Sequence, residues 1–365
     1  MTGLLERTFH QLDELLPGRA SKPGDNRSTA APGPSPKFCI VGAGAIGGMI
    51  ATLLAWSGAA VSVVARGQTL DALARDGTRL VIDRKTLQAS VQVSDQPSEL
   101  GVQDYVIVAV KAPSLPDIAR RIGPLLGPET TVVTAMNGVP WWFFHNAEGA
   151  LAGFQLKAID PDGAIGRAIP AERVIGCVVY VAASGDRPGV VRHSSGRRLI
   201  VGELDHGLTP RLARLVNWLR CAGFDCRESL NIQREIWVKL QSNLCMNPIS
   251  LLTTTTSDRI IGDPLVRRLC VSMMEEAARV GAAIGLPVST PGEETIETIR
   301  SLGSFRMSML QDLEHKRPVE IHALLTVVHD IGLSAGVPTP FIDGVLGLAR
   351  LRATSLGLLA RAANQ

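Results

Sequence analysis

Apolar and polar positions repeat in two different ways along this chain. Short apolar runs bounded by glycine, asparagine or charged residues, such as RVIGCVVYVAA, GVVRH and RRLIVGE, continue to about residue 208 and predict buried strands alternating with helices. From Thr209 nearly to the C-terminus, apolar residues recur mostly at helical spacing. The change of pattern predicts an α/β domain over residues 37–208 and an all-α helical domain over residues 209–365.

Residues 1–36 follow neither pattern. From Pro17 onward they collect glycine, proline, serine and charged residues with almost nothing to bury, which predicts a flexible leader. The opening LLERTFHQLDELL has apolar residues at helical spacing and could form a small docking helix. The alternative is that the chain has been assigned a start too far upstream.

Composition and charge exclude several classes of protein. The chain has 365 residues, 45% of them hydrophobic, which is enough apolar material for two domains. A net charge of +3 from dispersed residues gives no reason to expect a nucleic-acid partner. No apolar run approaches the roughly 20 residues of a membrane span and no signal peptide is apparent, so we expect no membrane partner and a cytoplasmic protein. Scattered cysteines without a CxxC pair, and histidines without ligand spacing, predict reduced packing thiols and no metal.

The first buried run leads into a glycine-rich turn with the sequence GAGAIG. Its glycines stand where a predicted strand ends and a predicted helix begins, which is the context that a dinucleotide site requires. The first permits a tight turn, the second allows the pyrophosphate to approach the backbone, and the third allows the helix to pack on the sheet. A glycine turn without a ligand is the alternative. The predicted cofactor-binding residues here are Gly42, Ala43, Gly44, Ala45, Ile46 and Gly47.

Two cations that follow later strands favour NADPH over NADH. NAD sites place an acid at the end of the second strand to bind the ribose 2′-hydroxyl, whereas this chain has Arg66 there. Lys111 follows the run YVIVAV, at the sheet edge where ligands bind, although a solvent-facing loop lysine would look the same. Because both cations suit a 2′-phosphate, the predicted cofactor is NADPH.

The segment WVKLQSNLCMNP places three polar side chains on one face of a predicted helix. At about 100° per residue, Lys239, Asn243 and Asn247 fall within about 80° of one another. The apolar residues between them occupy other angles and can be buried. We therefore predict that the polar stripe lines a cleft inside the protein, with an ordinary solvated helix face as the alternative.

Three more polar residues have an ordinary explanation beside a functional one. Asn137 and Gly138 follow the run TTVVTA at a strand end, where an amide can meet a ligand, but Asn-Gly is also the commonest turn dipeptide. Ser308 begins a predicted helix and Glu320 begins the next apolar-periodic segment. Helix capping and a first-turn acid are the favoured explanations of these two residues when they are considered alone.

Together, these segments resemble the ketopantoate reductase (2-dehydropantoate 2-reductase) family. The match runs in order over roughly residues 37–350 and comprises GAGAIG, Arg66, the VK of Lys111, Asn137-Gly138, WVKLQSNLCMNP, and SMLQD followed by Glu320. The resemblance implies a Rossmann-type dinucleotide-binding domain and a helical domain like the C-terminal domain of 6-phosphogluconate dehydrogenase. It also implies NADPH-dependent reduction of ketopantoate to (R)-pantoate, in the pathway to pantothenate and coenzyme A.

The resemblance also implies roles for single residues. Lys239 matches the catalytic lysine, which would stabilise the charge that a hydride leaves on the substrate oxygen and then protonate that oxygen. Asn243, Asn247 and Ser308 match residues that bind or orient the substrate. The matches to cofactor-binding residues are Arg66 and Lys111 at the 2′-phosphate, Asn137, and Glu320, which reaches the cofactor ribose and the active site.

The residues after Gly138 depart from the family pattern. The chain reads VPWWFFHNAEG and concentrates aromatic side chains from Trp141 to Phe144, in a protein that is only 4% aromatic. One explanation is a packed loop or a contact between subunits of a homodimer, and the other is a reshaped substrate pocket. The second would change the substrate to a different, bulkier 2-oxo acid. A further alternative is a non-catalytic NADPH-binding sensor, in which Lys239 would be dispensable.

Overall fold

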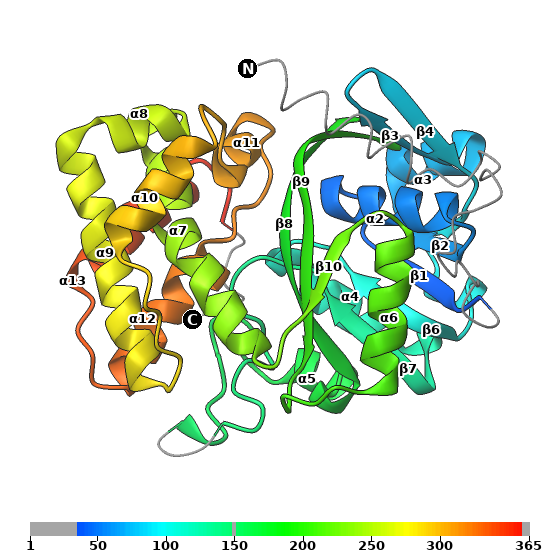
Figure 1. The fold of residues 1–365 in the computed structure, drawn as a ribbon, viewed down its shortest axis with the longest axis horizontal. Helices are drawn as coiled ribbons and strands as arrows, with labels where there is room; N and C mark the ends of the chain where they lie inside the picture. Colours follow the sequence, from blue (N-terminus) through cyan, green and yellow to red (C-terminus); the bar gives the residue numbers. More distant parts are fainter. Residues whose placement is uncertain (1–34, 148–150, 360–365) are drawn as a thin grey trace, which may run out of the picture.

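A mixed sheet of ten strands occupies one half of the molecule, and a group of helices occupies the other (Figure 1). The computed structural model describes residues 35–147 and 151–359. The leader predicted over residues 1–36 lies almost entirely outside the described residues. The fold confirms the predicted class, a Rossmann-type α/β domain followed by a helical domain.

The sheet runs in the order β4-β3-β9-β8-β7-β6-β1-β2-β5, and β10 pairs with β9 beside this path. All neighbours are parallel except β3 with β4 and β8 with β9. The chain enters at β1 and moves to β2 on one side and β6 on the other, so the carboxyl ends of these strands form the crevice where open α/β sheets bind ligands. The strands are β1 (Lys37–Val41), β2 (Ala60–Val64), β3 (Thr78–Ile82), β4 (Lys85–Ala89), β5 (Gln92–Ser94), β6 (Gln103–Val108), β7 (Leu126–Thr134), β8 (Val174–Arg187), β9 (Val190–Glu203) and β10 (Asp225–Glu228).

The helices belong to two groups. Those that connect strands are α2 (Ala45–Trp56), α3 (Gly67–Asp76), α4 (Leu115–Arg121), α5 (Ala164–Ala168) and α6 (Pro210–Cys221). The helical half contains α7 (Ile232–Thr253), α8 (Ser257–Gly262), α9 (Pro264–Ala283), α10 (Gly292–Ser301), α11 (Ser308–Glu314), α12 (Val327–Ser334) and α13 (Pro340–Ser355). One π-helical turn, His322–Thr326, precedes α12. Helix α7 contacts α9, α11 and α13 as well as β8, and it therefore connects the helical half to the sheet.

Helices cover both faces of the sheet because side chains alternate along each strand. On β1, Phe38 and Ile40 point into a core formed with α2 and α6. Cys39 and Val41 point to the opposite face, where the core includes α4 and continues into the helical half. The second core therefore holds the two halves of the chain together.

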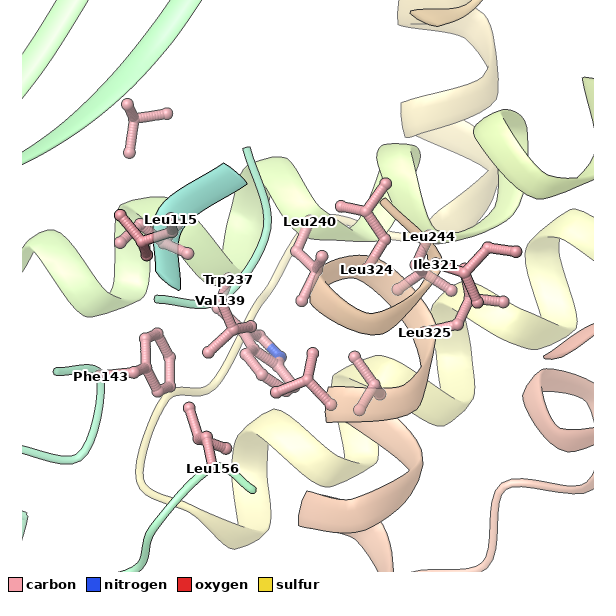
Figure 2. Packing of buried hydrophobic residues seen from close by; sticks show 14 of the residues in the cluster. Leu115, Val139, Phe143, Leu156, Trp237, Leu240, Leu244, Ile321, Leu324 and Leu325 are labelled. Atoms are coloured by element: carbon pink, nitrogen blue, oxygen red, sulfur yellow. The ribbon is translucent and has the colours of Figure 1, made fainter. Parts of the chain in front are cut away.

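Trp237 of α7 lies in the core that joins the two halves (Figure 2). Its side chain is 0% exposed, and its Nε1 donates a hydrogen bond to the carbonyl oxygen of Ala277 at 3.0 Å. On the sheet side, the ring centroid of Phe143 lies 5.9 Å from that of Trp237. This packing fixes α7, and with it the direction in which Lys239 projects two residues further along.

Two details of the sheet differ from the sequence prediction. The runs GVVRH and RRLIVGE form one strand, β9, which passes through Gly196 at φ +74° with a shift of register against β8. Helix α6 and strand β10 pack with the sheet, although the sequence pattern assigns everything after Thr209 to the helical domain. We therefore propose that the domain boundary falls in the turn before α7.

The described residues contain no helix that is both long and apolar enough to cross a bilayer. In the same part of the chain, no group of three or more histidine, cysteine or acidic side chains is arranged to hold a metal ion. The six cysteines are all free thiols, and only Cys221 is exposed. The buried thiols serve as small apolar packing residues.

Candidate active site

The glycine-rich turn forms an open cradle between β1 and α2. A Cβ atom at Gly47 would lie 1.9 Å from the carbonyl oxygen of Gly42, so only glycine lets α2 begin this close to the turn. In the part of the chain that the structure describes, no atom lies within 4 Å of the position that a Cβ atom would take at Gly44. Gly44 is also the N-cap of α2, so no side chain at this position caps the first N–H groups of the helix. The turn therefore leaves free N–H groups at a helix N-terminus, and this arrangement fits the pyrophosphate of a dinucleotide.

The two predicted cations lie beyond the ends of parallel strands, and each has a carboxylate partner. Arg66 follows β2, and its Nη1 lies 3.0 Å from Oδ2 of Asp117 in α4. Lys111 follows β6, and its Nζ forms an ion pair with Asp312 of α11. Arg66 therefore remains at the edge of the sheet, whereas Lys111 joins the sheet to the helical half.

Lys239 projects from α7 to the sheet and is held by two acceptors. Its Nζ donates hydrogen bonds to Oδ1 of Asn137 at 2.8 Å and to the carbonyl oxygen of Val179 in β8 at 2.6 Å. The same nitrogen lies 5.6 Å from the ring centroid of Tyr180. Because an ammonium group has three hydrogens, one remains for a ligand.

The surroundings of Lys239 make its ammonium a better acid than that of a free lysine. Burial, the largest cause, lowers the pKa of Lys239 to about 8, and the nearby Glu320 carboxylate opposes this shift. Burial also raises the pKa of Glu320 above the usual value of a glutamate. An acid with a pKa close to the working pH transfers protons efficiently, so Lys239 suits general acid chemistry.

Asn247 holds the start of α11. Its Oδ1 accepts hydrogen bonds from Oγ of Ser308 at 2.7 Å and from the backbone N–H of Met309 at 3.3 Å, and its Nδ2 donates to the carbonyl oxygen of Asn243 at 3.2 Å. Asn247 is only 2% exposed. Asn243 is partly exposed, and its side-chain amide has no hydrogen-bond partner among the described residues. Of the two asparagines, Asn243 is thus the one available to a ligand.

Glu320 connects the helical half to the loop that follows β6. Its Oε1 accepts a hydrogen bond from the backbone N–H of Ala112 at 3.1 Å, and the residue is 5% exposed. Ala112 directly follows Lys111, which pairs with Asp312. The loop after β6 is therefore tied to the helical half at two adjacent positions.

The Asn137-Gly138 turn is packed against the π-helical turn of the helical half. Gly138 has φ +82°, and a Cβ atom there would lie 2.4 Å from the carbonyl oxygen of Ala323. The next residue, Val139, donates its N–H to the same oxygen at 3.0 Å. Turns of the π-helical type recur at functional sites, and this one fixes the position of Asn137, which in turn holds Lys239.

Most of the aromatic segment after this turn packs inside the chain. Trp142, Phe143 and Phe144 are 2%, 2% and 8% exposed. The ring of Phe144 lies edge-on to that of Phe154, with 5.4 Å between centroids. These three residues therefore fill the core and do not form a subunit contact. Trp141 alone of the four remains partly exposed.

A small, mainly apolar pocket lies between the aromatic segment and Asn137. Its lining includes Asn137, Trp141 and Ile236. Two buried polar atoms of lining residues, Oγ1 of Thr134 and Nε1 of Trp142, have no hydrogen-bond partner within the described residues. The pocket therefore has mainly apolar walls and lies beside the residue that holds Lys239.

Comparison with known proteins gives a family match in each half of the chain. Residues 38–206 match the family model described as "Ketopantoate reductase PanE/ApbA", and residues 231–353 match "Ketopantoate reductase PanE/ApbA C terminal". A 2-dehydropantoate 2-reductase of Mesorhizobium japonicum is 44% identical over 322 residues, which cover 88% of this chain and 99% of the relative. The chain belongs to the ketopantoate reductase family. It is therefore a dinucleotide-dependent oxidoreductase.

Several solved structures share the two-domain fold of this chain. One from Ralstonia solanacearum MolK2, described as a candidate ketopantoate reductase, has a TM-score of 0.85 at 49% identity and covers 88% of this chain and 99% of its own. A 2-dehydropantoate 2-reductase from Geobacter metallireducens GS-15 has a TM-score of 0.76 at 27% identity, with 86% and 99% covered. D-mandelate dehydrogenase, solved with NADH, shares the fold alone, with a TM-score of 0.74 at 21% identity and 88% and 99% covered.

Three participants in the candidate site were not predicted from the sequence. Val179 and Ala323 contribute only backbone carbonyl oxygens, which every residue type provides. Asp312 stands four residues after Ser308, and that spacing on a helix could have shown that both side chains face the same way. The structure also removes the ordinary explanation of Ser308, because the N-cap of α11 is Met307.

We expect the reductase activity to fall as the pH rises through about 8, the lowered pKa of Lys239. Above that pH, Lys239 loses its proton, which it could otherwise supply in the reduction of a carbonyl, whereas a lysine with the ordinary pKa of 10.5 would keep it. The measurement is kcat/KM at a series of pH values. At each pH, the change in cofactor absorbance is recorded over a range of substrate concentrations. A profile that stays flat until the ordinary lysine value would contradict the effect of burial.

Proposed function

We propose that this protein reduces ketopantoate (2-dehydropantoate) to (R)-pantoate with NADPH, in the pathway to pantothenate and coenzyme A, and that Lys239 is the general acid. The activity named for the Mesorhizobium japonicum relative supports the choice of reaction. The observation that carries the proposal is the position of the Lys239 Nζ atom, which has two protein acceptors and one hydrogen left over.

The two acceptors around Lys239 suit the enzyme both before and after proton transfer. Addition of a hydride, which the bound nicotinamide cofactor supplies, to the C2 carbon of a 2-oxo acid leaves negative charge on the carbonyl oxygen. On this proposal, the third ammonium hydrogen of Lys239 stabilises that charge and is then transferred. The remaining amine has two hydrogens, and these stay bonded to Asn137 and Val179. Lys239 therefore keeps its position when it becomes neutral.

Asn243 and Ser308 are proposed to hold the rest of the substrate. The side-chain amide of Asn243 offers a donor and an acceptor, which suit a hydroxyl or a carboxylate. The hydroxyl hydrogen of Ser308 is donated to Asn247, so the Ser308 oxygen is left as an acceptor for a substrate hydroxyl. Oδ1 of Asn247 already accepts two hydrogen bonds. We therefore propose that Asn247 acts by orienting Ser308 and not by binding the substrate directly.

The cofactor-binding residues are proposed to act at different points along the dinucleotide. The turn from Gly42 to Gly47 would hold the pyrophosphate, and the exposed Arg66 would hold the 2′-phosphate in place of its partly buried partner Asp117. Lys111 pairs with Asp312 close to Glu320, so we place Lys111 nearer to the reacting end of the cofactor than Arg66. Asn137 and Glu320 would complete the site at that end.

Arg66→Ala should raise the KM for NADPH by about 10- to 100-fold and leave the KM for NADH nearly unchanged, because hydrogen bonds to a charged group are worth about 1.5–3 kcal/mol. Steady-state kinetics with each cofactor measure the effect. Arg120→Ala is the matched control, since Arg120 also pairs with Asp117, at 3.2 Å, and is 69% exposed. An equal loss with both cofactors, or the same loss in Arg120→Ala, would show that Arg66 does not read the 2′-phosphate.

A second candidate is the reduction of a different, bulkier 2-oxo acid. The observation in its favour is the pocket beside Asn137, whose walls include Trp141 and Trp142 from the segment that departs from the family pattern. The same Lys239 chemistry would apply. Only the side chain of the substrate would differ.

The deciding experiment follows NADPH oxidation with ketopantoate and with a series of bulkier aliphatic and aromatic 2-oxo acids. The highest kcat/KM on ketopantoate is the expected result, and turnover should be lost in Lys239→Ala. A preference for a bulkier acid would favour the second candidate. Binding of NADPH without turnover of any acid would favour a non-catalytic sensor and reject both proposals.

A further inference from the structure

The outward face of α13 is apolar, although nothing among the described residues covers it. Phe341, Leu348 and Leu351 are 48%, 60% and 71% exposed. At about 100° per residue, these three fall on one strip of the helix, opposite to its buried residues such as Ala349. A helix that faces only solvent carries polar residues on that strip, so the pattern indicates a partner.

Two glycines in the middle of α13 lie on or beside the same strip. A Cβ atom at Gly344 or Gly347 would meet no described atom within 4 Å, so packing against residues 35–147 and 151–359 requires neither glycine. Each one weakens the helix relative to alanine. Glycine does allow the backbone of another element to come close. The two positions are therefore explained if a second helix packs on α13.

We infer that the second helix is α13 of another copy of this chain, packed antiparallel across a two-fold axis near Gly347 and Leu348. In that arrangement, Leu351 of each copy faces Gly344 of the other, and the Leu348 side chains of the two copies face each other beside the axis. The leucine side chains fill the space that the glycines leave. The contact is the same on both copies, as a two-fold interface requires.

The charges along α13 fit an antiparallel pair of identical helices. Asp343 near the start of the helix is 44% exposed, and its hydrogen bonds to His329 and Thr339 use only Oδ1. Arg350, two turns later, is exposed and forms no ion pair within the described residues. Antiparallel packing brings Asp343 of one copy close to Arg350 of the other, whereas parallel packing would place like charges together.

Light scattering after size-exclusion chromatography of the full chain, at micromolar concentration, tests the inference. The expected result is a dimer for the natural sequence and a monomer for Leu351→Glu. Leu302→Glu is the matched control, because Leu302 is 66% exposed and lies outside α13, and this variant should remain a dimer. A monomeric natural protein, a dimer that tolerates Leu351→Glu, or a mass that indicates a different bound chain would each overturn the inference.

Cross-linking gives a second measurement that does not depend on disrupting the contact. Leu348→Cys, in a Cys221→Ser background that removes the exposed thiol, should form a disulfide between two copies on mild oxidation. Leu302→Cys in the same background should not. Absence of the Leu348→Cys link in a protein that is dimeric would place the contact elsewhere. Neither measurement needs enzymatic activity. Both can therefore be interpreted even if the proposed function is wrong.

Discussion

Lys239→Ala should lower kcat for the 2-oxo acid by about 10²- to 10⁴-fold, the usual contribution of a positioned general acid. The change removes the proposed proton donor, and its two hydrogen-bond partners cannot replace it, because Oδ1 of Asn137 and the carbonyl of Val179 only accept hydrogen bonds. Binding of NADPH should be retained, since the glycine turn and Arg66 are untouched. Single-turnover kinetics together with a fluorescence titration of NADPH separate the two effects.

Two further variants show whether the proton or the charge of Lys239 matters. Lys239→Arg keeps the positive charge but holds its proton far more tightly, so it should remain slow. Lys157→Ala removes an exposed lysine and should behave like the natural protein. A loss smaller than about tenfold in Lys239→Ala would be inconsistent with general acid catalysis by this residue.

Gly138→Ala should lower kcat by about 10²-fold, the cost of displacing a catalytic group by about 1 Å. The added Cβ atom would lie 2.4 Å from the carbonyl oxygen of Ala323, in a backbone conformation of φ +82° that alanine adopts poorly. The turn must move away from the helical half to relieve the contact. Asn137 moves with it, and Lys239 then loses one of its two acceptors.

Gly303→Ala is the matched control for Gly138→Ala. Gly303 has φ +78°, nearly the same conformation, but a Cβ atom there would meet nothing within 4 Å. Thermal unfolding should show a loss of about 1–2 kcal/mol from backbone strain in Gly303→Ala. Gly138→Ala should lose more, because the contact with Ala323 adds to the same strain. Only Gly138→Ala should also lose turnover. Equal kcat values in the two variants would show that the contact with Ala323 does not position Lys239 for catalysis.

The sequence predicted the elements that depend on local patterns and missed those that depend on distant partners. The turn at Gly42 and the helix after it were predicted because glycine spacing and apolar periodicity are local properties. Strand β10 was not predicted, because four residues with one buried side chain have no clear periodicity and are stabilised by pairing with β9. Gly196 looked like a break between strands, but the ladder with β8 continues past it.

The candidate site shows the same limit. The spacing of Lys239, Asn243 and Asn247 predicted one shared face on a helix, and α7 is a helix over these positions. It could not show that Asn247 is hydrogen-bonded to Ser308, whereas the side chain of Asn243 has no hydrogen-bond partner among the described residues. The ion pair of Lys111 with Asp312 joins residues 201 positions apart, and no local pattern reveals such a partner. The aromatic segment was open to two explanations until burial showed that Trp142, Phe143 and Phe144 pack in the core.

The position of the Ala323 carbonyl depends on the number of residues in the π-helical turn at His322–Thr326 as well as on their identity. A π-helical turn accommodates an extra residue relative to an α-helical one. Deletion of a single residue there would allow a regular helix to form, and the helix would rotate the Ala323 carbonyl away from the loop after β7. In a sequence alignment, a one-residue gap at this place would therefore mark a relative in which the lysine that matches Lys239 is positioned by a different contact.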